Sequence, residues 1–150
     1  MIYQAEKIIE YLKVGDFTQA QNEAQAIFNT FKNSGTAAAI GLGKAISRSD
    51  LSLEQILPLV QFFWDENSEA GKTFAVSILS KRAKLGDRLM PVIYRMILSC
   101  ESDEAAERMA LTFLTRFFKE NPDYAGVLAD WEQDPAPYMK KIVEIIKQRA

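Results

Sequence analysis

The 150-residue sequence contains no histidine and only one cysteine, Cys100. Without histidine, the chain lacks the residue that most often acts as a general base and that activates a catalytic serine or cysteine. A lone cysteine cannot form an internal disulfide, and one thiol without imidazole is a poor ligand set for zinc. Cys100 lies in an apolar helical run, which is typical of a small core residue. We therefore expect no catalytic constellation of these types, no metal site and no cofactor.

A strong net charge and long apolar runs are missing as well. The formal net charge is -2 and the isoelectric point is near 5.3, so the whole molecule has no general attraction to nucleic acid or to anionic lipid. No apolar run reaches the roughly 18 residues that a membrane-spanning helix needs. Residues 1–13 alternate charged and apolar side chains and lack the uninterrupted apolar core of a signal peptide. We expect a cytoplasmic protein without a membrane partner.

What the sequence does contain is helical periodicity. In residues 5–31, apolar side chains recur at steps of three and four, with breaks at Gly15–Asp16 and again at residues 33–35. Ser52 is followed three residues later by Gln55, which is the spacing of a capping box at a helix start. No stretch alternates apolar and polar residues in the manner of a strand, so the fold is predicted to be all-α.

Residues 36–47 are small and apolar and include Gly41-Leu42-Gly43-Lys44, which resembles part of a phosphate-binding loop. The Walker pattern also requires a glycine where Ala38 stands, a serine or threonine where Ala45 stands, and a preceding strand. Close packing of another helix against these small residues is the better interpretation.

The second half carries an internal repeat. Pro58 is predicted to open one apolar helix and Pro91 the next, because proline fits a first helical turn, where its missing N–H has no partner to lose. The second helices, residues 74–81 and 109–116, match each other in residue class at every position. A third, shorter unit begins at residue 122. Stacked helix pairs cover each other's apolar faces and build a solenoid.

The proline-initiated helix, the acidic turn and the second helix with an Ala-x-x-x-Leu stripe resemble HEAT-like repeats. This resemblance implies a short right-handed α-α superhelix of stacked antiparallel helix pairs. We expect a single domain over residues 1–150. Its parts are an irregular first unit, 1–50, and repeat units at about 55–84, 88–120 and 122–150.

The first unit leaves its classification open. Residues 11–20 resemble the Leu-x-x-Gly-x-x-x-x-Ala core of a tetratricopeptide repeat, but no second copy follows. Both alternatives give stacked antiparallel helix pairs. The second helices are expected to line the concave side and to bury Phe74, Ile78, Phe113, Leu114, Phe117, Ile142 and Ile145.

The densest basic cluster consists of Lys81, Arg82, Lys84 and Arg88. Between residues 71 and 119, Lys and Arg outnumber Asp and Glu, although the whole chain is slightly acidic. A basic stripe along a solenoid groove can follow the phosphates of a nucleic acid, and such binding weakens steeply as salt rises. In the alternative interpretation, cations simply favour a helix C-terminus and the remaining charges lie on solvated faces.

The last unit contains a second candidate site. Trp131 leads into a turn that starts at Asp134, and Tyr138, Lys140 and Lys141 follow on the next helix. This arrangement resembles the HEAT-like DNA alkylation-repair glycosylases, in which a tryptophan precedes a turn and an aromatic residue and paired basic residues come after it.

The resemblance implies a role for each of these side chains. The two aromatic rings would stack on a base, the two lysines would hold phosphate, and Asp130 or Asp134 would supply the carboxylate that helps to expel an alkylated base. In the alternative interpretation, Trp131 packs between repeats and Asp134 only forms the turn.

Because no complete catalytic constellation is present, the sequence favours a recognition surface. We expect a non-catalytic helical-repeat module that binds a protein or peptide partner on its concave face. The leading alternative is a nucleic-acid-binding module related to the alkylation-repair enzymes. A third possibility is a homo-oligomer in which the isoleucine-rich last helix is buried by self-association.

Overall fold

The computed structural model describes residues 2–30, 35–66, 68–100 and 102–149. Within these ranges the chain is helical and contains no β-strand, so the all-α prediction is confirmed. No helix in the same ranges is both long enough and apolar enough to cross a membrane.

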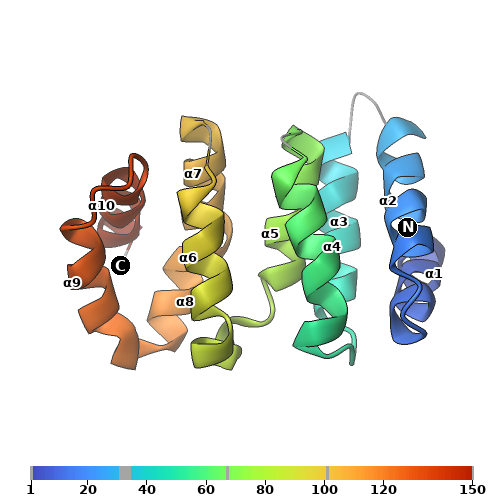
Figure 1. Ribbon diagram of the computed structural model, residues 1–150, viewed down its shortest axis with the longest axis horizontal. Coiled ribbons are helices and arrows are strands. Elements are labelled where there is room, and N and C mark those ends of the chain that lie inside the picture. The colour runs from blue at the N-terminus through green and yellow to red at the C-terminus, as the bar shows by residue number, and fades with distance from the viewer. Residues whose placement is uncertain (1, 31–34, 67, 101, 150) are drawn as a thin grey trace. The chain divides into compact units, whose positions relative to one another are not determined.

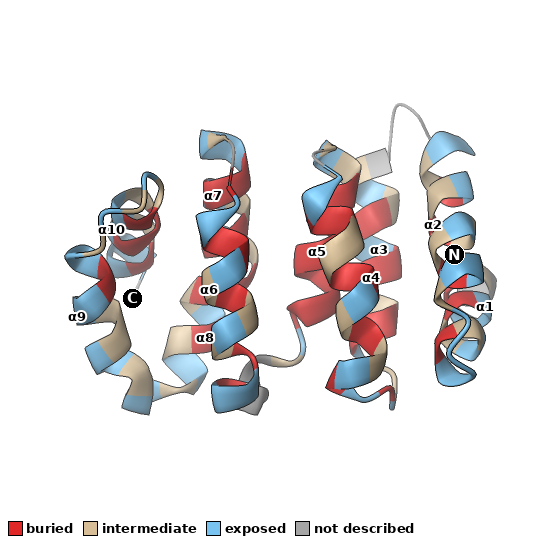
Figure 2. Cartoon of the chain, viewed as in Figure 1, coloured by how far each residue is buried: buried red, intermediate tan, exposed pale blue. Residues whose placement is uncertain are grey.

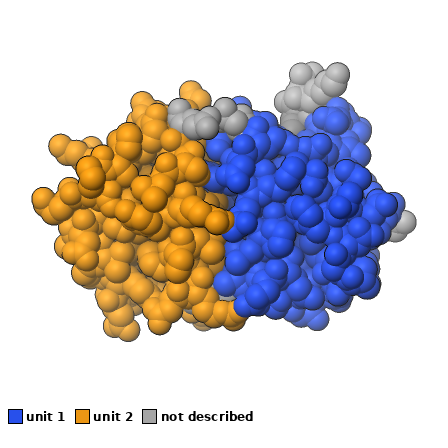
Figure 3. Space-filling model, viewed as in Figure 1, with its two compact units in different colours: residues 1–81 blue, residues 82–150 orange. Residues whose placement is uncertain are grey.

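The chain divides into two compact units, unit 1 (residues 1–81) and unit 2 (residues 82–150), which are coloured separately in Figure 3. The single repeat domain expected from the sequence stays a prediction. In unit 1, helix α1 packs against α2 and α3, and both α3 and α4 pack against α5. These helices, labelled in Figure 1, are α1 (Ile2–Lys13), α2 (Phe17–Thr30), α3 (Gly35–Ser47), α4 (Leu53–Asp65) and α5 (Glu69–Leu79).

A glycine turn separates α1 from α2, as the sequence predicts. Gly15 has a φ of 76°, in the left-handed region that favours glycine. Asp16 then caps α2, because its carboxylate accepts a hydrogen bond from the Gln19 N–H at 3.2 Å. The second predicted break, at residues 33–35, lies outside the described residues except for Gly35, where α3 begins.

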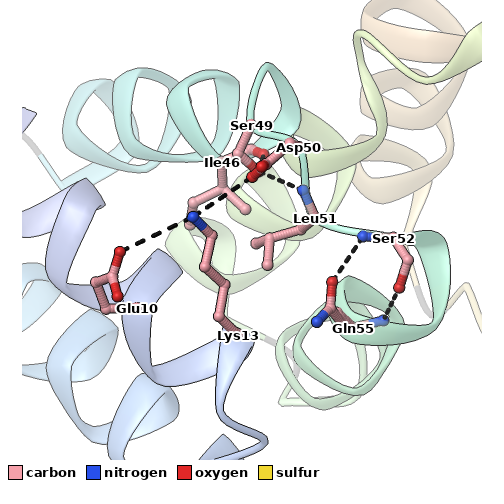
Figure 4. Close-up of polar contacts among 8 residues, drawn as sticks. All are labelled: Glu10, Lys13, Ile46, Ser49, Asp50, Leu51, Ser52 and Gln55. Carbon is pink, nitrogen blue, oxygen red and sulfur yellow. Dashed lines mark hydrogen bonds and ion pairs between the residues drawn. The ribbon is translucent and has the colours of Figure 1, made fainter.

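The start of α4 is fixed by a capping box, shown in Figure 4. The Ser52 hydroxyl accepts a hydrogen bond from the Gln55 N–H at 3.2 Å, and the Gln55 side-chain oxygen accepts one from the Ser52 N–H at 2.8 Å. The predicted cap is confirmed, but the prediction that Pro58 opens the helix is wrong. Pro58 lies inside α4, because the cap has already started the helix at Leu53. Pro58 and Glu54 are both exposed, so water can reach the Glu54 carbonyl that loses its helical donor.

Replacing Ser52 by Ala should lower the free energy of unfolding by about 1 kcal/mol, because the first turn of α4 loses the side chain that satisfies its N–H. Chemical denaturation followed by circular dichroism measures this change. Lys13→Ala is the control, since Lys13 Nζ lies 3.6 Å from Asp50 Oδ1 in an exposed ion pair (Figure 4) that contributes little. A Ser52→Ala protein as stable as the unmodified chain would contradict the role of the cap.

Helix α5 is the central helix of unit 1. Every residue from Gly71 to Leu79 is buried (Figure 2). Phe28, Phe63 and Phe74 form an edge-to-face cluster between α2, α4 and α5, with ring centroids 5.0, 5.2 and 5.6 Å apart. These contacts place the core of unit 1 around α5.

The buried Lys72 of α5 is paired with Trp64 of α4. Trp64 is 1 % exposed and packs in the core of unit 1. The Lys72 ammonium donates a hydrogen bond to the Trp64 carbonyl oxygen at 2.6 Å and lies 4.2 Å from the centroid of the indole ring. The carbonyl and the ring therefore both stabilise a charge that burial would otherwise disfavour.

Helices α3 and α5 approach each other closely at Gly43. A Cβ at this position would lie 2.5 Å from the Ser77 Cβ, 3.1 Å from the Phe74 carbonyl oxygen and 3.2 Å from the Ile78 nitrogen. Only glycine fits there without a shift of the α5 backbone. The Gly-Leu-Gly-Lys stretch lies inside α3, so this segment is a helix-packing surface, as predicted.

Unit 2 is built from shorter helical segments. Pro91 lies in the first turn of α6, as the sequence predicts. Helix α10 packs against α7, η2, α8 and α9, whereas η1 packs against α6 and α8. The segments are η1 (Ala83–Arg88), α6 (Met90–Leu98), α7 (Asp103–Met109), η2 (Ala110–Leu114), α8 (Thr115–Glu120), η3 (Pro122–Tyr124), α9 (Ala125–Glu132) and α10 (Met139–Arg149).

A π-helical segment, η2, interrupts the helix that runs from α7 to α8. The Thr115 hydroxyl donates a hydrogen bond to the Ala110 carbonyl oxygen at 2.9 Å, and Leu111 is 48 % exposed. The predicted counterpart, residues 74–81, has no such interruption, so the match in residue class does not extend to the backbone. Of the expected core residues, all are buried except Ile145, which is half-buried: Phe74, Ile78, Phe113, Leu114, Phe117 and Ile142.

Candidate functional site

The turn between α9 and α10 holds a carboxylate, Asp134, whose two oxygens both accept hydrogen bonds. Asp134 lies two residues after the end of α9 at Glu132, and its Oδ1 accepts a hydrogen bond from the Ala136 N–H at 2.8 Å. This local bond is typical of an Asx turn. The Ala136 carbonyl in turn accepts the Met139 N–H, where α10 begins. The turn therefore fixes the position of the carboxylate relative to both helices.

Tyr94 of α6 holds the other oxygen of the same carboxylate. The Tyr94 hydroxyl donates to Asp134 Oδ2 at 2.6 Å, and both side chains are half-buried. The hydrogen bond to Asp134, desolvation and the nearby negative charge raise the pKa of Tyr94. The hydrogen bonds from Tyr94 and from the Ala136 N–H lower the pKa of Asp134 and outweigh its desolvation. Asp134 is therefore an ionised, oriented carboxylate at neutral pH.

Trp131 lies beside this pair but faces the core. It is 4 % exposed, its ring is 6.5 Å from that of Tyr94, and it meets Phe118 edge to face at 5.4 Å. In this conformation the indole is buried, because a large apolar ring gains more from burial among aromatic neighbours than from exposure at a turn. The implied stacking of Trp131 on a base stays a prediction, which requires the ring to become exposed.

The two lysines of α10 have different surroundings. Lys140 is exposed. Lys141 is half-buried, and its Nζ lies 3.5 Å from Asp103 Oδ2 and 3.4 Å from Glu107 Oε1. Desolvation lowers the pKa of Lys141, but the charges of Asp103 and Glu107 and the hydrogen bonds to them outweigh it and raise the pKa. The implied phosphate-binding role of Lys141 must therefore compete with two carboxylates. Tyr138 is half-buried.

The predicted basic cluster falls at the boundary of the two units. Lys81 ends unit 1, where its N–H donates to the Ser47 hydroxyl at 2.9 Å. In unit 2, Lys84 and Arg88 are exposed on η1, and burial lowers the pKa of Arg82. Lys84 and Arg88 therefore belong to the same segment, η1, whereas Lys140 and Lys141 lie on α10. In the described ranges, no group of three or more cysteine, aspartate and glutamate side chains could hold a metal ion.

The sequence of this chain matches a model of the DNA alkylation repair enzyme family over residues 14–146. The chain belongs to that family. No curated protein and no solved structure matches it significantly. The match covers both compact units, from the end of α1 almost to the end of α10.

Family membership corrects the main functional expectation. The sequence was expected to encode a non-catalytic module for a protein or peptide partner, and this expectation is wrong, because the DNA alkylation repair enzyme family favours the nucleic-acid alternative. The error came from net charge and from elimination. The net charge of the whole chain and the lack of a histidine-based constellation do not exclude a site that depends on one oriented carboxylate, because such a group contributes only a single charge.

Tyr94 is the site residue that the sequence analysis missed. It lies forty positions from Asp134, so no local motif connects the two. The one available signal was a hydroxyl-bearing ring in the mostly apolar segment Met90–Leu98, in which Arg95 is the charged residue. A half-buried tyrosine usually finds a hydrogen-bond acceptor, which the sequence alone does not identify.

Proposed function

We propose that this member of the DNA alkylation repair enzyme family binds alkylated DNA and releases the damaged base, with Asp134 as the electrostatic catalyst. The family match supports the substrate class. The single observation that carries the role of Asp134 is its double anchoring, by the Tyr94 hydroxyl at 2.6 Å and by the Ala136 N–H at 2.8 Å. A carboxylate held in this way does not need to reorganise during the reaction.

The chemistry of an N-alkylated purine suits a site that lacks histidine. The alkylated ring already carries a positive charge, so the bond between the sugar and the base breaks without protonation of the base. The bonding electrons leave with the base, which becomes neutral, and the sugar acquires oxocarbenium character, as in glycoside hydrolysis. Water then adds to the sugar and releases a proton. A fixed negative charge near the sugar lowers the energy of this transition state.

Between the two candidate carboxylates, the geometry supports Asp134 over Asp130. Asp130 is exposed on α9, whereas Asp134 is half-buried and bonded at both oxygens. Because the pKa of Asp134 is lowered, its charge persists as the pH falls from neutrality through the ordinary range of Asp carboxyls. The proposed site therefore keeps its catalytic charge throughout the physiological range.

The DNA contacts in this proposal come from exposed cations of unit 2. Lys84 on η1 and Lys140 on α10 are exposed, and neither has an ion-pair partner among the described residues. Arg88 adds charge beside Lys84. Arg82 and Tyr138 complete the proposed interface of unit 2, and Lys141 contributes only where phosphate displaces Asp103 and Glu107. Lys81 belongs to unit 1, and its proposed phosphate contact is a separate one.

A HEAT-like arrangement is part of the same proposal. The proposed repeat units at about 55–84, 88–120 and 122–150 correspond in order to α4 with α5, to α6 with α7–α8, and to α9 with α10. Neighbouring helices of such pairs pack on each other in unit 1, where α4 contacts α5, and in unit 2, where α9 contacts α10. Helix pairs stacked in this way supply an extended binding surface.

A double replacement, Lys84→Ala with Lys140→Ala, should weaken binding to duplex DNA and reduce the magnitude of the salt slope of log K by about two, because each lost phosphate contact removes about 0.9. Fluorescence anisotropy with a labelled duplex, measured between about 50 and 200 mM salt, gives this slope.

The matched control removes the same charge from cations that already have partners. Arg116 bonds to Glu120 at 3.0 Å, and Lys147 pairs with Glu132. Arg116→Ala with Lys147→Ala should therefore leave the salt slope nearly unchanged. Equal slopes for the two double variants would show that net charge alone, and not the proposed interface, sets the affinity.

A further inference from the structure

Unit 2 contains an apolar pocket that the proposed DNA chemistry does not use. Its volume is about 360 Å³, and it is lined by residues of α8, η3, α9 and α10. Phe118, Leu128 and Ile146 supply much of its apolar wall. This volume lies at the lower end of the range of small-molecule pockets, about 300–1,000 Å³.

Two cations, Lys119 and Arg149, stand at this pocket. Lys119 and Arg149 both line it and are both exposed, and no Asp or Glu belongs to the lining. Neither cation has an ion-pair partner among the residues that the structure describes. An apolar cavity bordered by unpaired positive charge is complementary to a molecule with an apolar body and one anionic group.

The π-helical segment η2 directly precedes the α8 wall of the pocket. Thr115, which also lines the pocket, donates its hydroxyl hydrogen to the Ala110 carbonyl across the wider turn. Such segments are costly irregularities and occur frequently at functional sites. Phe118 and Lys119 follow this segment on α8.

The lining argues against a flipped nucleobase as the occupant. A base in a pocket is normally recognised by hydrogen bonds along its edge. The Thr115 hydroxyl already donates its hydrogen to the Ala110 carbonyl, and the other polar side chains that line the pocket are those of the two cations. A base buried there would leave polar edge atoms without partners, which is unfavourable.

We propose that this pocket binds a medium-chain carboxylate, with its hydrocarbon chain against Phe118, Leu128 and Ile146 and its carboxylate between Lys119 and Arg149. A hydrocarbon chain has no hydrogen-bonding groups, so it can be buried against the apolar wall without leaving polar atoms unpaired. The carboxylate forms charge-assisted hydrogen bonds with the two cations, and a guanidinium can bind it with two parallel bonds. This site is separate from Asp134 and does not rest on the proposed excision activity.

Isothermal titration calorimetry of the full chain with sodium decanoate tests the proposal. Binding to one site is expected, and Lys119→Gln with Arg149→Gln should weaken it by about tenfold or more, because a charged pair of hydrogen bonds is lost. Arg116→Gln is the matched control on the same helix, since Arg116 pairs with Glu120 and does not line the pocket. Decanol, which has the same chain without charge, should bind more weakly than decanoate.

The results of these titrations either support or overturn binding of decanoate in the pocket. No binding of decanoate, or equal binding by the double variant and by the Arg116→Gln control, would overturn the proposal. Competition between duplex DNA and decanoate would also overturn it, because the two cations would then be phosphate contacts. A loss of decanoate binding in Leu128→Asn, in a protein whose circular dichroism spectrum is unchanged, would support the assigned apolar wall.

Discussion

Replacing Asp134 by Asn should slow the release of an alkylated base by about 100- to 1000-fold, which is typical of the loss of one preorganised electrostatic group. Asparagine has nearly the same shape and retains a side-chain oxygen, so the turn and its contact with Tyr94 can persist while the negative charge disappears. Single-turnover measurements of base release from methylated duplex DNA give the rate. DNA affinity should change little, because the carboxylate stabilises the transition state and does not hold phosphate.

Asp130→Asn is the matched control, because it removes the same charge from an exposed position of α9. It should retain nearly the full excision rate. Tyr94→Phe should cause an intermediate loss, since the carboxylate keeps its charge but loses the hydroxyl that donates to it at 2.6 Å. An Asp134→Asn protein with an unchanged rate would exclude Asp134 from the reaction.

The pH dependence of the site follows from the direction of the pKa shift. The pKa of Asp134 is lower in the folded protein than its ordinary value, because Tyr94 and the Ala136 N–H hydrogen-bond to the charged form. The group therefore stabilises the fold above the ordinary Asp pKa, and this stabilisation is lost as the pH falls through the folded value. An excision rate governed by Asp134 should stay level from neutrality down through the ordinary Asp range and fall only at lower pH.

Replacing Gly43 by Ala should lower the free energy of unfolding by about 1–3 kcal/mol or more, which is the usual cost of overpacking a buried contact. The new Cβ would lie 2.5 Å from the Ser77 Cβ and within 3.2 Å of two α5 backbone atoms. A backbone cannot give way as a flexible side-chain end can, so α3 and α5 must separate. Chemical denaturation measures the change, with thermal unfolding as a second measurement.

Two further variants make the Gly43 prediction specific. Gly126 lies in α9, where an added Cβ meets nothing within 4 Å, so Gly126→Ala should stabilise the chain by up to about 1 kcal/mol. Adding Ser77→Gly to Gly43→Ala removes the closest clashing atom and should recover part of the lost stability, as a double-mutant cycle would show. Equal effects of the two Gly→Ala replacements would contradict close packing at Gly43.

The helical fold could be predicted from sequence because its signals are local. The Ser52 and Gln55 capping box, the Gly15 turn and the apolar spacing each depend on residues within a few positions of each other. The position of Pro58 could not be predicted as well, because an upstream cap competed with proline as the helix start and the cap prevailed. The π-helical segment was also missed, since residues 109–116 match a regular helix in residue class.

The site was less predictable because its contacts are distant in sequence. The motif around Trp131 drew attention to the turn that holds Asp134, but it implied an exposed tryptophan, whereas Trp131 is buried. Burial of Trp131 depends on Tyr94 and Phe118, which lie on other helices. The pairing of Lys141 with Asp103 and Glu107 likewise requires α7 and α10 to be adjacent. The sequence therefore shows that Lys141 carries a charge, but it does not show that two carboxylates of α7 lie beside that charge in the fold.

Mass spectrometry of free methylated purines, released from a methylated duplex by the purified chain, tests the central claim most directly. Release should exceed the spontaneous rate, rise in proportion to the amount of protein and leave one abasic site for each free base. Release at only the spontaneous rate, with folded protein in excess over DNA that it binds, would contradict the account.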